Sequence, residues 1–68
     1  MTISYDKLWK LVLENKMKRQ DLAKAAEISA NTVTKLGKNE TVSIEVLLKI
    51  CKVFHCDIGD IMEVIETD

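Results

Sequence analysis

The sequence predicts a small all-α domain, a compact bundle of about five short helices. Apolar residues recur at helical spacing along most of the chain, and only a few residues separate the segments that carry this pattern. The chain is 47% hydrophobic yet has two glycines and no proline, which argues against disorder and against many-stranded sandwiches. Because 68 residues have room for one core, residues 1–68 are expected to form a single domain.

The first three helices are expected at about 5–15, 19–26 and 30–36. The apolar positions that define the first of them are Leu8, Leu11 and Val12. Ser29 is a favourable N-cap for the third helix, and Gly37 follows its last apolar residue, where a glycine commonly ends a helix.

A loop over 38–42 then leads to a fourth helix that begins after Ser43, a second favourable N-cap. Its apolar stripe consists of Leu47, Ile50, Cys51 and Phe54. Asp57 is expected to cap a short fifth helix. The apolar residues of this fifth helix are Ile58, Ile61 and Met62. The residues expected at the centre of the core are Leu22, Ala23, Val33, Leu36, Leu47, Ile50 and Phe54.

The two ends of the chain, 2–4 and 62–66, do not have helical periodicity. They are rich in β-branched residues, or they alternate apolar with acidic residues. Two interpretations remain open. Either the ends pair as short antiparallel strands, within one chain or between two chains, or they fray.

The stretch 19–36 is the most informative part of the chain because it has the pattern of a helix-turn-helix. Small alanine residues allow its two helices to cross closely over a short turn. The second helix of this motif, at about 30–36, carries Asn31, Thr32 and Thr34, which are poor helix formers. A solvent-exposed face without a further role is usually built from better helix formers, so this composition favours a surface that reads DNA.

The net charge is −1, but the charges are unevenly distributed along the chain. Residues 16–38 hold six basic and two acidic residues, whereas residues 39–68 hold two basic and seven acidic residues. Such a dipolar arrangement can orient a protein toward a polyanion. Taken alone, the charge pattern is explained equally well by a mixed, soluble surface. Together with the helix-turn-helix pattern it favours DNA.

Two sets of spaced residues run through most of the chain: Leu22-Ala23-x-x-Ala26-x-Ile28-x-x-x-x-Val33-x-x-Leu36, and then Leu47-x-x-Ile50-Cys51-x-x-Phe54-x-Cys56-x-Ile58-x-Asp60-Ile61. This pattern resembles the phage repressor/Cro-type (Xre-like) helix-turn-helix family, and in particular its minimal single-domain members. The resemblance extends from about Tyr5 to Met62. Glu27 departs from it, because many members have glycine at this turn position. A left-handed backbone at a non-glycine residue costs about 1 kcal/mol.

The resemblance implies that the third helix enters the major groove of DNA. The residues that would then meet the bases are Ala30, Asn31, Thr34 and Lys35. The carboxamide of Asn31 can pair with adenine N6 and N7 together. Lys35 could donate to guanine O6 and N7, and the methyl group of Ala30 could touch a thymine methyl group.

The resemblance also implies phosphate contacts near the ends of the second and third helices. The residues concerned are Lys18, Arg19, Ser29, Thr32, Lys38 and Asn39. The backbone N–H groups at the start of the second helix favour an anion independently of any side chain. Ser29 serves as an N-cap whether or not DNA binds. Lys38 and Asn39 are equally well explained as solvated loop residues.

Cys51, His55 and Cys56 lie close together in the sequence but do not indicate a zinc site. Cys51 belongs to the apolar stripe, a continuous helix would place Cys56 roughly 140° away from it, and the chain has no second Cys/His cluster. The same geometry argues against a disulfide between the two cysteines. We therefore expect no metal and no cofactor.

An enzyme is not expected. The chain has a single histidine, no nucleophile beside a plausible base and no glycine-rich phosphate loop, and it is too small to enclose a sizeable pocket. No small-molecule ligand is expected either. No apolar run is long enough to span a membrane, and the first residues lack the features of a secretory signal. Two cysteines are too few for a secreted disulfide scaffold, so a cytoplasmic location is expected.

The sequence therefore predicts a sequence-specific DNA-binding transcriptional regulator, with repression by occupying an operator as the favoured mode. The alternative is a protein-interaction module, antitoxin- or antirepressor-like, that binds protein through its helix-turn-helix. One copy reads too few base pairs for genomic specificity, so a homodimer that is weak without DNA is expected. Its candidate surfaces are the fourth and fifth helices, through Val53, Ile58 or Met62, and the terminal segments 2–4 and 63–66.

Overall fold

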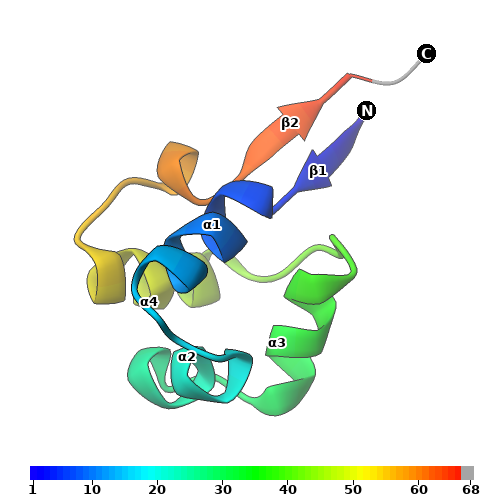
Figure 1. The fold of residues 1–68 in the computed structure, drawn as a ribbon. Coiled ribbons are helices and arrows are strands. Elements are labelled where there is room, and N and C mark those ends of the chain that lie inside the picture. The colour runs from blue at the N-terminus through cyan, green and yellow to red at the C-terminus, as the bar shows by residue number, and fades with distance from the viewer. Residues whose placement is uncertain (67–68) are drawn as a thin grey trace.

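The computed structural model of the protein describes residues 1–66, which form four α-helices, one 3₁₀ turn and a two-stranded sheet (Figure 1). In chain order the elements are β1 (Thr2–Ser4), α1 (Asp6–Glu14), α2 (Arg19–Ala26), α3 (Ala30–Gly37), α4 (Ile44–Phe54), η1 (Ile58–Asp60) and β2 (Glu63–Ile65). The first four predicted helices are confirmed, with boundaries that differ only slightly from those expected. None of the helices in this part of the chain is long and apolar enough to cross a membrane.

The prediction of a fifth α-helix after Asp57 is wrong, because this segment forms only the 3₁₀ turn η1. Asp57 does cap the turn, since its Oδ1 accepts the Ile58 N–H (3.2 Å). Asp60 Oδ2 in turn accepts the Asp57 N–H (2.9 Å). The turn cannot lengthen into a helix because the chain leaves it for β2, where pairing with β1 satisfies the backbone groups instead.

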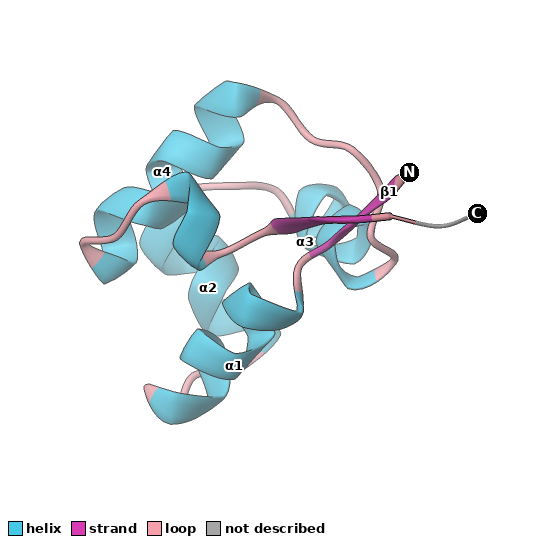
Figure 2. Ribbon diagram, turned by 90° about the horizontal axis from the view of Figure 1, so that it is seen from above, coloured by secondary structure: helices cyan, strands magenta, loops and turns pink. Residues whose placement is uncertain are grey.

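The two ends of the chain pair with each other as an antiparallel ribbon. The paired residues are Thr2 with Ile65, Ile3 with Val64 and Ser4 with Glu63. Figures 1 and 2 show the ribbon projecting from the helical body, with both ends of the chain on the same side. Of the interpretations that the sequence left open, pairing within one chain is therefore the one observed.

The core lies among the helices and is closed by residues from both ends of the chain. Its buried apolar residues are Tyr5, Leu8, Val12, Leu22, Ala26, Leu36, Leu47, Ile50, Cys51 and Ile61. The predicted centre of the core is largely confirmed, but Ala23 and Phe54 are only half-buried. Tyr5 and Ile61 are instead almost fully enclosed, because the ribbon and η1 bring them back onto the helices.

Tyr5 ties the start of α1 to the loop that follows α3. Its hydroxyl donates to the Glu40 carbonyl (2.9 Å), and its N–H donates to Asn39 Oδ1 (3.1 Å). A phenol is a neutral donor at neutral pH, and burial raises the pKa of the Tyr5 phenol further above its ordinary value. These two bonds anchor the loop after α3 on the core.

Candidate nucleic-acid interface

The turn between α2 and α3 is closed by Glu27 in a left-handed conformation (φ 57°, ψ 46°). The Ile28 N–H donates to the Ala23 carbonyl across this residue (3.0 Å), which completes a Schellman motif at the end of α2. The side chain of Ile28 packs against the core. Glu27 therefore occupies a backbone conformation that favours glycine, and the turn forms in spite of the departure from the family pattern.

The start of α3 is held by a pair of hydroxyl groups. Ser29 Oγ accepts the Thr32 N–H (3.1 Å) and lies 2.9 Å from Thr32 Oγ1. The predicted N-cap role of Ser29 is confirmed. Both residues are also predicted phosphate contacts, and their hydroxyls lie together at the helix end where the first backbone N–H groups have no intrahelical acceptor.

The four predicted base-reading residues are exposed on α3, while the opposite face of this helix packs into the core. Ala30 and Thr34 form one row along the helix, and Asn31 and Lys35 form the adjacent row. The Thr34 hydroxyl donates to the Ala30 carbonyl (3.1 Å), so it can offer only acceptor lone pairs outward. Within residues 1–66 the side chains of Asn31 and Lys35 take part in no hydrogen bond or ion pair, so their polar groups are available to a ligand.

Two predicted phosphate contacts lie at the start of α2. Lys18 is the N-cap residue, and its N–H donates to Asp21 Oδ2 (2.8 Å) while its side chain is exposed. The Arg19 guanidinium lies over the ring of Trp9 from α1, with Cζ 4.7 Å from the ring centroid. The contact with Trp9 was not predicted. Its only signal in the sequence was an aromatic residue at the margin of the first helix's apolar face.

The remaining two phosphate candidates follow α3. Lys38 is exposed directly after the helix. Asn39 has a left-handed backbone (φ 57°), and its Oδ1 is engaged by the Tyr5 N–H. Asn39 therefore has a structural role that the sequence did not reveal, and its amide NH₂ is the group that remains able to donate to a phosphate.

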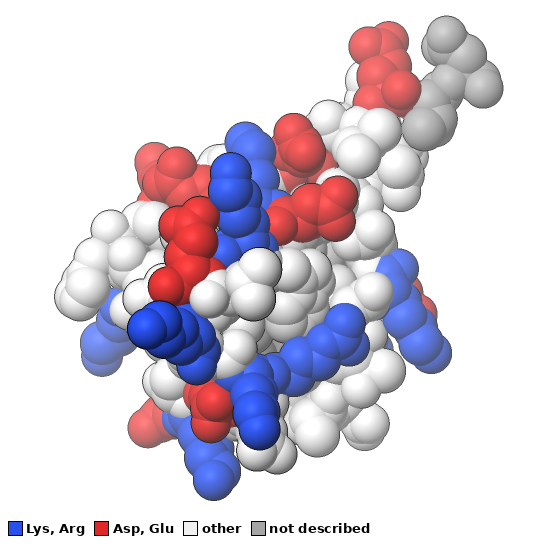
Figure 3. Space-filling model, viewed as in Figure 1, with Lys and Arg blue, Asp and Glu red and all other residues white. Residues whose placement is uncertain are grey.

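Basic and acidic side chains are unevenly spread over the surface. Figure 3 shows Lys and Arg mainly around α2 and also over α1, whereas Asp and Glu are more frequent toward the ribbon and the visible surface of α3 is largely uncharged. This distribution matches the sequence, in which residues 16–38 are predominantly basic and residues 39–68 predominantly acidic. The basic residues of the helix-turn-helix thus lie mostly on and beside α2.

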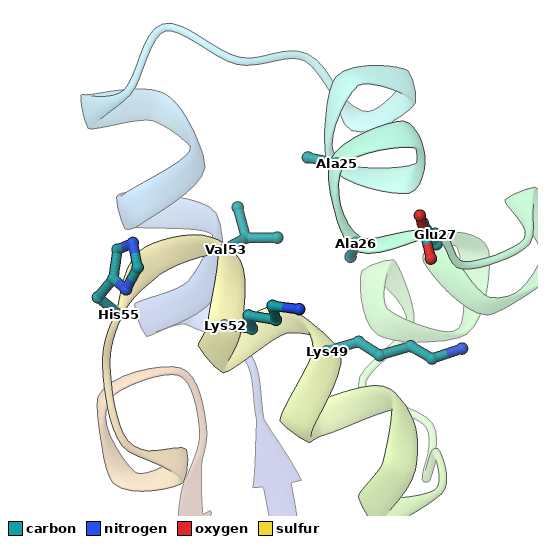
Figure 4. Close-up of a pocket in the computed structure, with 7 residues that line it drawn as sticks. All are labelled: Ala25, Ala26, Glu27, Lys49, Lys52, Val53 and His55. Atoms are coloured by element: carbon teal, nitrogen blue, oxygen red, sulfur yellow. The ribbon is translucent and has the colours of Figure 1, made fainter.

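A shallow hollow of about 530 Å³ lies between the end of α2 and α4. Its lining residues are Ala25, Ala26, Glu27, Lys49, Lys52, Val53 and His55. Figure 4 shows that the residues of α4 face those of α2 across it. None of the predicted base or phosphate contacts lines this hollow, so it is distinct from the candidate nucleic-acid interface.

The apolar residues expected on a dimer surface are less accessible than predicted. Val53, Ile58 and Met62 are half-buried against the core, because η1 and the end of α4 pack on it. The large exposed apolar side chains of α4 are Ile44 and Leu48. In the ribbon they include Val64 and Ile65, and Met1 directly before β1 is exposed as well.

The two cysteines lie closer together than a continuous helix would place them. Because α4 ends at Phe54 and His55 is left-handed (φ 52°), the Cys56 N–H returns to the Cys51 carbonyl (3.1 Å). The prediction that the two cysteines occupy well-separated directions is therefore wrong. Burial, with the neighbouring Cys56 thiol as a smaller cause, raises the pKa of the Cys51 thiol. No cluster of three or more potential metal ligands occurs among the residues described.

Comparison with known proteins agrees with this geometry. Residues 7–67 match the family of Cro/C1-type helix-turn-helix DNA-binding domains. The chain is also similar to a crystal structure of the transcriptional regulator VanUg, with 48% sequence identity and a TM-score of 0.90 over 97% of this chain and 88% of that chain. No curated protein matches the chain significantly. The chain belongs to the Cro/C1-type helix-turn-helix DNA-binding family, as its residue pattern predicted.

Proposed function

We propose that this protein is a sequence-specific transcriptional regulator that inserts α3 into the major groove of an operator and represses by blocking access of the polymerase. The observation that carries the proposal is the surface of α3. It combines unengaged polar side chains, Asn31 and Lys35, with a buried opposite face that fixes their direction. The similarity to a transcriptional regulator supports the same function.

In this proposal the exposed face of α3 supplies sequence readout, and its surroundings supply phosphate contacts. Asn31 reads adenine, Lys35 reads guanine, and Ala30 and Thr34 pack against neighbouring base edges. Lys18, Arg19 and Lys38 contact phosphates on either side of the groove, with further contacts from Ser29, Thr32 and Asn39. The phosphate contacts set affinity and register, and the α3 side chains set the sequence.

Selection of bound duplexes from a random pool tests this proposal most directly. We expect a defined sequence to emerge, with an affinity that falls steeply as salt rises, because several phosphates are neutralised on binding. Failure to enrich any sequence, together with salt-insensitive binding to a protein partner, would instead support the antitoxin- or antirepressor-like alternative.

Asn31→Ala and Lys38→Ala separate the two kinds of contact on the selected duplex. Asn31→Ala should reduce discrimination at one base pair by about 1–3 kcal/mol. Lys38→Ala should weaken selected and random duplexes alike and reduce the salt slope by roughly one unit. An equal loss on selected and random DNA for Asn31→Ala would exclude a base-reading role for this residue.

The proposed active form is a homodimer that is weak without DNA and firm on a two-fold operator. One α3 helix spans only a few base pairs, and two copies placed one DNA turn apart supply the missing specificity. Acidic Glu63, at the start of β2, and Glu66, directly after it, oppose tight association in the absence of DNA. Sedimentation at tens of micromolar, with and without the selected duplex, should give two protomers per duplex at saturation. A single protomer per duplex would contradict this stoichiometry.

A further inference from the structure

The guanidinium of Arg19 is the meeting point of three helices. Arg19 is the first residue of α2, and its Cζ lies 4.7 Å from the centroid of the Trp9 ring in α1. The same group lies against Gly37 at the end of α3. A Cβ built at Gly37 would be only 2.7 Å from Arg19 Nη1 and 3.2 Å from Cζ. The position of this guanidinium therefore depends on an aromatic ring and on a missing side chain.

The absence of a Cβ at Gly37 is not required by the backbone there. Neither glycine of the protein has a positive φ, so alanine could adopt the local conformation of Gly37 without strain. The atoms that alanine would displace belong to the end of the flexible Arg19 side chain. Space for the guanidinium is thus the distinctive property that glycine provides at this position.

The contacts leave the hydrogen-bonding capacity of Arg19 unused. A cation–π contact employs the ring face of the aromatic residue, whereas the guanidinium N–H donors lie in the plane of the group. Between residues 1 and 66 the Arg19 side chain makes no ion pair and no hydrogen bond, and it is exposed. The negative end of the α3 dipole, next to Gly37, further favours a cation at this place.

We infer that Trp9 and Gly37 are positioning residues for the phosphate contact of Arg19, an inference that rests on the proposed DNA-binding function. Trp9 holds the guanidinium by its ring, and Gly37 leaves room for it beside the end of α3. The flexible side chain is thereby held at a defined place before DNA arrives. The Arg19 side chain then loses less conformational freedom when its N–H groups donate hydrogen bonds to a phosphate.

Double-mutant cycles on the selected duplex test the inference. Trp9→Leu should weaken binding about two- to fivefold, the equivalent of one exposed cation–π contact. The loss should be the same on selected and random duplexes, because a phosphate contact carries no base information. In an Arg19→Ala background, which lowers the salt slope by about 0.9, Trp9→Leu should have no further effect. Trp9→Phe should restore most of the binding because it keeps an aromatic face.

Gly37→Ala is a second test of the inference, and this variant should keep the fold intact. It should weaken binding to an extent similar to Trp9→Leu without lowering the melting temperature, and should have no effect once Arg19 is alanine. Gly59→Ala is the matched control, because nothing lies within 4 Å of its added methyl group, and it should leave binding unchanged. In free protein, NMR should show Arg19 side-chain protons shifted upfield by the Trp9 ring, and Gly37→Ala should reduce that shift.

Two results would overturn the inference. One is a Trp9→Leu loss that persists undiminished in the Arg19→Ala background, which would mean that Trp9 acts only on the fold. The other is a Gly37→Ala protein that binds as tightly as the parent. Failure of the proposed function is seen separately, because the unmodified protein would then bind no duplex with salt-dependent affinity.

Discussion

The helix-turn-helix, residues 19–37, and the two ends of the chain are built in contrasting ways. In the helix-turn-helix, the end of α2 and the start of α3 are determined by residues close in sequence. Glu27 ends α2 with a left-handed backbone, and Ser29 caps α3 by accepting the Thr32 N–H. At the ends, β1 and β2 pair although nearly the whole chain separates them in sequence. The turn η1 ends after three residues, and the chain then continues into β2. The exposed face of α3 therefore depends on local signals, whereas the ends depend on contacts that only the completed fold provides.

Leu36→Ala is expected to have the largest effect, because it removes packing beneath the exposed face of α3. Leu36 is fully buried in the core. The substitution should lower the free energy of unfolding by about 2–5 kcal/mol, a large part of the stability of so small a domain. Denaturant titration measures the change. Leu48→Ala is the control, because Leu48 is 57% exposed and its truncation should change stability by less than about 0.5 kcal/mol.

The N-cap Ser29 of α3 lies inside the helix-turn-helix, and the N-cap Ser43 of α4 lies outside it, so substituting each serine compares the same interaction in the two regions. Ser29 accepts the Thr32 N–H at 3.1 Å, and Ser43 accepts the Val46 N–H at 3.2 Å. Ser29→Ala and Ser43→Ala should each lower the free energy of unfolding by about 1 kcal/mol. Ser29→Ala should cost slightly more, since Thr32 also loses a hydroxyl partner. A negligible effect at Ser29 would show that tertiary packing alone determines where α3 begins.

Glu27→Gly tests the backbone strain at the turn of the helix-turn-helix. Because Glu27 has φ 57°, glycine should raise the free energy of unfolding by up to about 1 kcal/mol, reduced by the greater freedom of glycine in the unfolded chain. Thermal melts at neutral pH measure the gain. Glu27→Ala is the control that removes the carboxylate but keeps the Cβ, and it should give no comparable increase.

Val64→Thr should have the smallest effect, and it asks how far the ribbon contributes to stability. Val64 pairs with Ile3 but is 63% exposed, and threonine keeps the β-branched shape. The free energy of unfolding should therefore change by less than about 0.5 kcal/mol. A loss above roughly 1.5 kcal/mol would indicate that the ribbon is integral to the core.

The candidate site was more predictable than the ends of the chain. The exposed face of α3 follows from helical periodicity and from its N-cap Ser29, which the sequence displays within a few residues. The glycine expected to end this helix, Gly37, is instead its last helical residue, and Lys38 is the C-cap. The Trp9–Arg19–Gly37 contact was not predicted, because it joins three helices whose relative placement has no local signal. The structural role of Asn39 was missed for the same reason, since its partner Tyr5 is distant in sequence.

The predicted separation of Cys51 and Cys56 failed because of the conformation of one residue between them. A helical wheel separates Cys51 from Cys56, but it assumes that the helix continues past Phe54. Left-handed His55 ends α4 there and turns Cys56 back toward Cys51. Non-glycine residues rarely adopt this conformation, so the sequence held no clear sign of it.

The sequence by itself determined the α-helical class, the places where α1 to α4 begin, the helix-turn-helix and its family. These depend on periodicity, capping and short turns, which act over a few neighbouring residues. Only the tertiary structure decided that the ends pair, that η1 remains a single turn, and that Tyr5 and Ile61 complete the core. Each of these requires backbone or side-chain partners far away in the chain, and such partners come together only when the whole domain has folded.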